Sequence, residues 1–95
     1  MTKDEMKKVC RQAVGKWGEE AQLRQAQEEA AELIVAINHY LRGRALSLDH
    51  LVRELADMRI MMEQLEFILA IEGKTADYER RIESMIESLQ EKINK

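Results

Sequence analysis

Proline is absent from the 95 residues, glycine occurs only four times, and aromatic residues make up 4% of the chain. The sequence is instead rich in Ala, Leu, Glu, Lys, Arg and Met, which have the highest helix propensities. We therefore predict an all-α protein in which Leu, Ile and Met, and not aromatic rings, fill the contacts between helices. Residues 1–95 are expected to form a single domain, near the lower end of the size that supports one core.

Cysteine is also scarce. Cys10 is the single cysteine, which excludes an internal disulfide framework and is typical of a reducing compartment. We interpret its side chain as a small buried or half-buried group. The chain has no apolar run near the roughly 20 residues that a membrane span needs, and the segment MTKDEMKK does not have the apolar core of a signal peptide.

The net charge of −3 argues against non-specific nucleic-acid binding, which requires a basic face. The absence of a long apolar run and of a signal peptide predicts a soluble, cytoplasmic protein. Neither a nucleic acid nor a membrane is expected as a partner.

The first helix is predicted to be short. Thr2 and Glu5 have the spacing of a capping box, which opens a helix that runs to about Val14. The glycines on either side of Trp17 are expected to break this helix. Trp17 then has two alternative roles, as a plug at the end of a helical bundle or as a ring that stacks on a ligand base.

The second helix is predicted over about residues 19–41, and Gly43 has the position of a C-terminal cap. Its apolar residues recur at three- and four-residue steps and form one stripe: Leu23, Ala26, Ala30, Leu33, Ile37 and Leu41. The flank of that stripe comprises Gln22, Gln25, Glu29, Glu32 and Ala36. Acids on such a flank face a neighbouring helix, and Glu28 is turned too far round to be an equal candidate.

The third helix is predicted to begin at Ser47, as an N-cap, and to end at Gly73. It carries a heptad seam formed by Leu48, Leu51, Leu55, Met58, Met62, Leu65 and Leu69. A second apolar face is formed by Val52, Ala56, Ile60, Phe67 and Ile71. A helix with two apolar faces needs more cover than short neighbours provide, so we expect it to lie in a subunit interface. The last helix is predicted to start at Thr75.

Two pairs of acids are the most informative residues. Glu29 and Glu32 are three residues apart, as are Glu54 and Asp57, so each pair shares one face of its helix. A turn at residues 42–44 would fold the helices into an antiparallel pair and bring the acids together. Like charges in a semi-buried groove repel one another, and a divalent cation removes this cost. Hard oxygen ligands favour Mg²⁺, with Mn²⁺ as an alternative.

The acids form an E-x-x-E pattern at 29–32 and an E-x-x-D pattern at 54–57, with 21 residues between the two. This arrangement resembles the MazG-like family of all-α nucleoside triphosphate pyrophosphohydrolases. The segments KWGEEAQLRQAQEEAAELIVAINHYLRG and LVRELADMRIMMEQLEFIL are similar to the two motif helices of that family. The resemblance covers about residues 16–69.

That resemblance implies Mg²⁺-dependent hydrolysis of a ribo- or deoxyribonucleoside triphosphate to the monophosphate and pyrophosphate. The implied metal ligands are the four acids, Glu29, Glu32, Glu54 and Asp57. A carboxylate that is not fully engaged by metal can act as general base, and Glu32 and Glu54 are both candidates. We expect two long antiparallel helices with short flanking helices, which form a four-helix core by oligomerisation as a homodimer or homotetramer.

Residues that can contact the nucleotide are Trp17, Gln22, Gln25, Met61 and Arg81. The two glutamines lie one and two turns before Glu29, and they either bond a base or sugar or form a solvated polar flank. Met61 is either adaptable core or part of the nucleotide pocket. His39 and His50 are either boundary residues or partners of the metal-binding carboxylates, and without cysteines they do not compose a usual zinc site.

The last helix departs from the family pattern. Small members often carry a Lys and an Arg there that contact phosphates, whereas Met85 and Ser88 occupy those positions here. Arg80, Arg81 or Lys92 can substitute, although charges on a terminal helix usually form a solvated face. A second hypothesis is therefore a non-catalytic helical oligomer of the same fold that binds a nucleotide or a protein partner. A plain helical scaffold, the third, explains the heptad seam but not the acids beside it.

Overall fold

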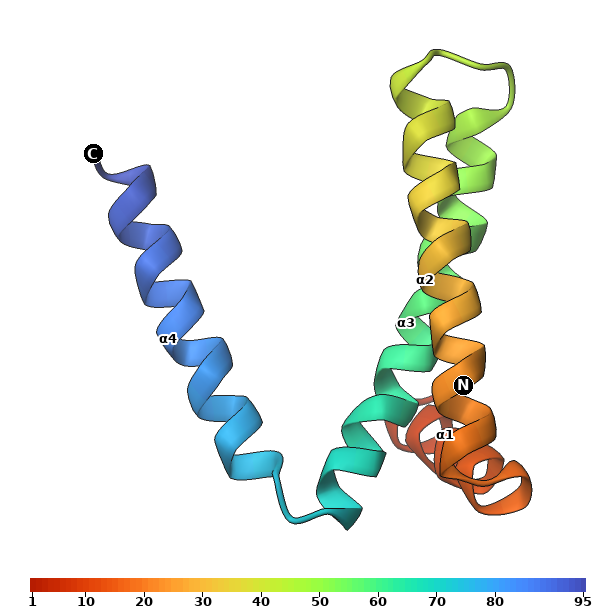
Figure 1. The fold of residues 1–95 in the computed structure, drawn as a ribbon, viewed down its shortest axis with the longest axis vertical. Coiled ribbons are helices and arrows are strands. Elements are labelled where there is room, and N and C mark those ends of the chain that lie inside the picture. Colours follow the sequence, from red (N-terminus) through yellow and green to blue (C-terminus); the bar gives the residue numbers. More distant parts are fainter.

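The computed structural model describes all 95 residues and contains four helices and no strand, so the predicted all-α class is confirmed. The helices are α1 (Lys3–Trp17), α2 (Glu19–Leu41), α3 (Ser47–Ile71) and α4 (Thr75–Ile93). In Figure 1, α2 and α3 lie side by side and run in opposite directions, and α1 lies at the end of this pair that is far from the 42–46 loop. α4 diverges from the other three helices. None of the four combines the length and the hydropathy that crossing a bilayer requires.

The start of α1 follows the prediction, but its end does not. Glu5 N donates to Thr2 Oγ1 (3.1 Å) and Thr2 N donates to Glu5 Oε2 (3.2 Å), which completes the capping box. The predicted end near Val14 is wrong, because the helix continues to Trp17. Gly15 lies inside the helix, where glycine costs only about 0.5–1 kcal/mol relative to alanine. The break falls at Gly18, whose φ of 92° favours glycine.

The ends of α2 and α3 were both predictable from glycine. Gly43 has φ 69°, Gly43 N donates to Tyr40 O, and Arg44 N donates to His39 O. These two bonds are the Schellman arrangement, in which a left-handed residue satisfies the last carbonyl groups of a helix. Gly73 ends α3 in the same way. The turn after α2 sends the chain back along that helix.

The predicted N-cap of α3 is wrong. Ser47 is the first residue of the helix, and the N-cap is Leu46, whose side chain cannot accept a hydrogen bond. Leu46 has φ 60°, in the left-handed region. Ser47 is buried, and its N–H donates to Arg44 O. The hydrogen-bond partner of this N–H is therefore a backbone carbonyl of the turn, and not a capping side chain.

The contact between α2 and α3 lies on the flank of the predicted apolar stripe and takes in only part of the stripe itself. Ala26 and Ala36 are buried, whereas Leu23, Ile37 and Leu41 are exposed. The small alanines permit close approach of the helices, and polar residues of the flank turn inward with them. The apolar stripe is thus left partly uncovered within one chain.

Much of the remaining apolar surface is also uncovered. α4 has no buried residue, although its apolar stripe contains Ile82, Met85, Ile86, Leu89 and Ile93. Exposed members of the α3 heptad seam are Leu48, Leu55 and Met62. The hydrophobic residues that are buried are Cys10, Val14, Ala26, Ala36, Met61 and Ile68. A single chain therefore buries few of its large side chains.

Candidate metal centre and adjoining pocket

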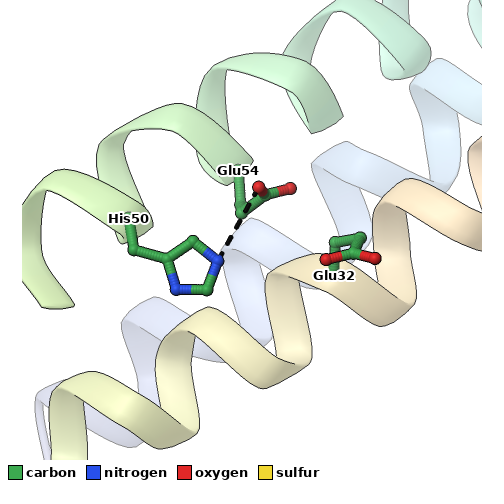
Figure 2. Close-up of side chains that lie close together, drawn as sticks. All are labelled: Glu32, His50 and Glu54. Carbon is green, nitrogen blue, oxygen red and sulfur yellow. Dashed lines mark ion pairs between the residues drawn. The ribbon is translucent and has the colours of Figure 1, made fainter. Parts of the chain in front are cut away.

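The acids of α2 and α3 meet in two overlapping groups. In the first, ligand atoms of Glu29, Glu54 and Asp57 lie within 4.8 Å of one another. In the second, ligand atoms of Glu32, His50 and Glu54 do so, and Figure 2 shows these three side chains. Glu54 belongs to both groups. The four acids therefore share one site. We call this group the acid cluster; it comprises Glu29, Glu32, Glu54 and Asp57.

The acid cluster lies at the border between the helix contact and solvent. Glu29 and Glu54 are half-buried, and the Glu54 side chain is 14% exposed, whereas Glu32 and Asp57 are exposed. His50 Nε2 lies 3.8 Å from Glu54 Oε1, the pair joined by the dashed line in Figure 2. No lysine or arginine forms an ion pair with any of the four acids. Their mutual repulsion is therefore not relieved by a permanent cation of the chain.

Local sequence explains why these side chains meet. The three-residue spacing places both acids of each helix on the side that faces the other helix. The turn at Gly43 then sets α2 and α3 antiparallel, with Glu32 opposite Glu54. Several carboxylate oxygens and one imidazole nitrogen form a donor set that fits a divalent cation such as Mg²⁺ or Mn²⁺.

His39 lies beside this site but does not bond the cluster. Its Nε2 lies 3.2 Å from Arg44 Nη1, and its ring centroid lies 5.5 Å from that of His50. Desolvation lowers the pKa of His39, and the positive charge of Arg44 lowers it further. This shift favours the neutral ring, whose Nε2 can accept a hydrogen bond from Arg44 Nη1.

A shallow pocket of about 410 Å³ adjoins the acid cluster and is lined by Trp17, Ala21, Gln22 and Gln25. Gln25 Nε2 donates to Glu29 Oε1 at 3.0 Å, which connects the pocket to the acids. Trp17 does not plug the bundle: it is 60% exposed, because α1 extends to that residue and ends at the surface. Lys16 Nζ lies 5.6 Å from the Trp17 ring centroid.

Three of the five predicted nucleotide contacts therefore line one pocket, and two do not. Met61 is buried and is not among the residues that line the pocket. Arg81 is exposed on α4, which diverges from the acid-bearing helices (Figure 1). The structure does not bring Arg81 to the acid cluster within one chain.

Sequence analysis does not single out one residue of this region, Gln64. It lies seven positions after Asp57, on the same side of α3, and this spacing is the signal that could have identified it. Gln22 Nε2 donates to Gln64 Oε1 at 2.6 Å, and Gln64 Nε2 donates to Met61 Sδ at 3.8 Å. A buried chain of polar contacts thus lies directly beneath the pocket.

Comparison of the chain with protein-family models, with curated proteins and with solved structures finds no match in any of the three. A cluster of four acids and one imidazole can bind a divalent cation, and the adjoining ring and amides can contact a planar polar ligand. Both features lie on the α2–α3 pair and the end of α1.

Proposed function

We propose that this protein is a nucleotide pyrophosphohydrolase, which hydrolyses a ribo- or deoxyribonucleoside triphosphate to the monophosphate and pyrophosphate. The acid cluster would hold Mg²⁺, with Mn²⁺ as the alternative ion. One observation carries the proposal: ligand atoms from two helices converge within 4.8 Å, and Glu54 belongs to both groups. The E-x-x-E and E-x-x-D patterns that resemble the MazG-like family supply these acids.

Bound metal would neutralise phosphate charge, orient the triphosphate and lower the pKa of an attacking water. The chain itself would supply the ligands and a general base. Glu54 belongs to both groups, so it would be the acid most engaged by metal. Glu32 belongs to one group and is exposed, which favours Glu32 over Glu54 as the base.

The pocket supports a nucleotide as the substrate. Trp17 offers an exposed aromatic face on which a base can stack, and stacking contributes roughly 1–3 kcal/mol per base. Gln22 and Gln25 offer amide groups beside that face. Gln25 also bonds Glu29, so a base in the pocket would place its phosphates toward the acid cluster.

The proposal includes assembly of two or more copies around a four-helix core. Within one chain, Leu23 and Ile37 of α2 and Leu55 of α3 are exposed, although each belongs to a regular apolar stripe. Burial of a large apolar side chain contributes about 1.5–3 kcal/mol. A second α2–α3 pair placed on these stripes would recover that energy, in a homodimer or in a homotetramer of two such dimers.

The alternative function is a non-catalytic helical oligomer that binds a nucleotide or a protein partner. One observation favours it: no lysine or arginine pairs with the acid cluster, and Arg81 lies on the diverging helix. Tight binding of a triphosphate requires positive charge around its phosphates. In the alternative, the site would not bind the triphosphate tightly enough for turnover.

The deciding experiment measures pyrophosphate release from a panel of ribo- and deoxyribonucleoside triphosphates, in Mg²⁺, in Mn²⁺ and in chelator. We expect metal-dependent release that is lost in Glu54→Gln. Glu28→Gln is the matched control, because Glu28 is an exposed acid of α2 outside both ligand groups. Absence of release with every triphosphate and both metals would refute the enzyme and favour the binding protein.

A further inference from the structure

A second pocket, of about 440 Å³, lies between α1, α3 and the first residue of α4. We call it the basic pocket, because its lining contains four basic side chains: Lys3, Lys7 and Arg11 of α1 and Arg59 of α3. Arg59 lies two residues after Asp57, and residues two apart on a helix point about 200° apart. The basic pocket is therefore on the opposite side of α3 from the acid cluster.

The three basic residues of α1 share one face of that helix. Lys3, Lys7 and Arg11 are spaced four residues apart, so they form a row with a rise of about 6 Å from one residue to the next. None of the three forms an ion pair with a carboxylate of the chain. α1 thus presents a row of cations whose charge is not neutralised within the chain.

Two acids also line the basic pocket, but both already have partners. Arg59 Nη1 donates to Glu63 Oε2 at 3.1 Å, and the Glu63 side chain is 10% exposed. Glu66 forms a hydrogen bond with Tyr78 of α4. Four cations minus two carboxylates leave the lining with a net charge of +2, whereas the whole chain carries −3. The surplus positive charge of the pocket comes from the row on α1.

Arg11 is held against an aromatic ring. Its guanidinium carbon lies 5.5 Å from the centroid of the Phe67 ring, which is the distance of a cation–π contact. Phe67 is half-buried and lines the same pocket. The guanidinium carries five N–H donors in a planar fork that matches phosphate oxygens. The basic pocket therefore combines one oriented guanidinium with two lysine side chains beside it.

We infer that the basic pocket binds a linked di- or triphosphate group, either as free polyphosphate or as the phosphate chain of a nucleotide. The row on α1 spans about 12 Å of helix axis, so a chain of phosphates meets more of these cations at once than a single phosphate does. A bound polyanion also relieves the repulsion between the cations. This site is separate from the acid cluster, needs no metal ion and does not rest on the proposed function.

The test uses wild-type protein freed of metal ions, because an acid cluster without metal repels phosphate. Isothermal titration calorimetry at low salt compares inorganic triphosphate, pyrophosphate and orthophosphate. We expect triphosphate to bind at least about tenfold more tightly than orthophosphate, with an affinity that falls as added salt screens the charges. No binding of triphosphate at millimolar concentration, or equal affinity for triphosphate and orthophosphate, overturns the inference.

Charge-neutralising variants locate the bound anion. A double variant with Lys7→Gln and Arg11→Gln should bind triphosphate at least about tenfold more weakly, because it loses two charge-assisted contacts. Both residues are exposed, so the variant should fold, and thermal unfolding checks this. Lys16→Gln is the matched control, because Lys16 is an exposed lysine of α1 outside the basic pocket. An equal loss of affinity in Lys16→Gln would mean that the overall charge of α1 attracts the anion, and it would contradict a defined site.

A gain of affinity provides the sharpest result. Glu63→Gln removes one negative charge from the lining, and its amide oxygen can still accept a hydrogen bond from Arg59. Triphosphate should therefore bind about threefold more tightly to this variant. Damage to the fold would not raise the affinity. Unchanged or weaker binding by a folded Glu63→Gln protein would refute the basic pocket as the binding site.

A nucleotide distinguishes the two sources of the phosphate chain. Equal affinity for adenosine triphosphate and inorganic triphosphate would support the site with free polyphosphate as its ligand. Tighter binding of the nucleotide that is lost in the double variant would support the site with a nucleotide as its ligand. Nucleotide binding that persists in the double variant occurs elsewhere and refutes a nucleotide as the ligand of this pocket. All of these measurements are made without metal, so their outcome is independent of pyrophosphate release.

Discussion

His50 Nε2 lies 3.8 Å from Glu54 Oε1, and this imidazole is the one basic group that forms an ion pair with the acid cluster. Four carboxylates face this single imidazole, so the cluster carries excess negative charge, which a metal ion would relieve. Repulsion between the acids would thereby link metal binding to the stability of the α2–α3 contact.

Asp57→Asn should raise the stability of the metal-free protein and abolish its response to Mg²⁺. Two like charges about 4 Å apart in water repel by about 1 kcal/mol, which corresponds to roughly 4–8 °C in Tm for a domain of this size. Wild-type protein at ten times the metal Kd should gain about 1.4 kcal/mol. Thermal unfolding with Mg²⁺ and with chelator measures both effects.

Asp49→Asn is the control for this change, since Asp49 is an exposed acid of the same helix outside both ligand groups. It should leave the Mg²⁺ response intact. An unchanged Tm in metal-free Asp57→Asn, with a wild-type Mg²⁺ response, would show that Asp57 neither strains the groove nor binds metal.

The thiol of Cys10 should be unreactive in the folded protein. Cys10 Sγ donates to Ile60 O (3.8 Å), and burial raises the pKa of the thiol, with the charge of Glu63 raising it further. The protonated form is thus favoured by folding. This contribution to stability is present below the ordinary thiol pKa and is lost as pH rises through the folded value.

Iodoacetamide alkylation in mildly alkaline buffer tests this, with mass spectrometry of native and urea-unfolded protein. Because the thiolate is the reactive species, the native rate should be at least about tenfold lower. Equal rates would mean that the α1–α3 contact opens on the time scale of the reaction.

Local signals and long-range packing differ in how far the sequence predicts them. Thr2 with Glu5 and the glycine at position 43 act on neighbouring backbone, and the helix ends that they predict are present. The N-cap at Ser47 is wrong because the conformation of Leu46 depends on how the whole turn closes. Spacing in the sequence reveals capping residues but not the dihedral angles between them.

The same distinction applies to the apolar faces and the site. A hydrophobic stripe marks every helix face that must be buried, but it does not indicate whether a helix of the same chain or of another chain buries it. The exposure of Leu23 within one chain could therefore not be predicted. The acids at 29–32 and 54–57 follow from three-residue spacing, and they do meet. The bond between Gln22 and Gln64 joins residues 42 positions apart, and only the register of α2 against α3 determines it.

Glu66→Gln should lower the pKa of Tyr78, at the junction of α3 and α4. Burial raises this pKa, and the charge of Glu66 and its hydrogen bond with the tyrosine raise it further. The neutral phenol therefore stabilises the fold below the ordinary tyrosine pKa, and this contribution is lost as pH rises through the folded value. Ultraviolet titration of tyrosinate should show one of the two tyrosines shifting down in the variant.

Glu72→Gln is the matched control, because Glu72 is exposed and lies in the same junction. It should leave both tyrosine titrations unchanged. Identical titration of wild-type protein and Glu66→Gln would contradict the contact between Glu66 and Tyr78.

Leu55→Asp should dissociate the assembly that we propose. Leu55 is 57% exposed in the single chain, so in a monomer the substitution should change the free energy of unfolding by only about 0.5 kcal/mol. In a four-helix core, the same substitution buries an unpaired charge between two copies, which the interface cannot accommodate. Sedimentation equilibrium should give a dimer or tetramer for wild-type protein and a monomer for the variant.

Arg53→Asp is the control, because it adds the same side chain on the opposite side of α3: residues two apart on a helix point about 200° apart. This variant should leave the assembly intact. A wild-type monomer would instead mean that the exposed stripes of α2 and α3 are covered by a different protein, which is the behaviour expected of the non-catalytic alternative.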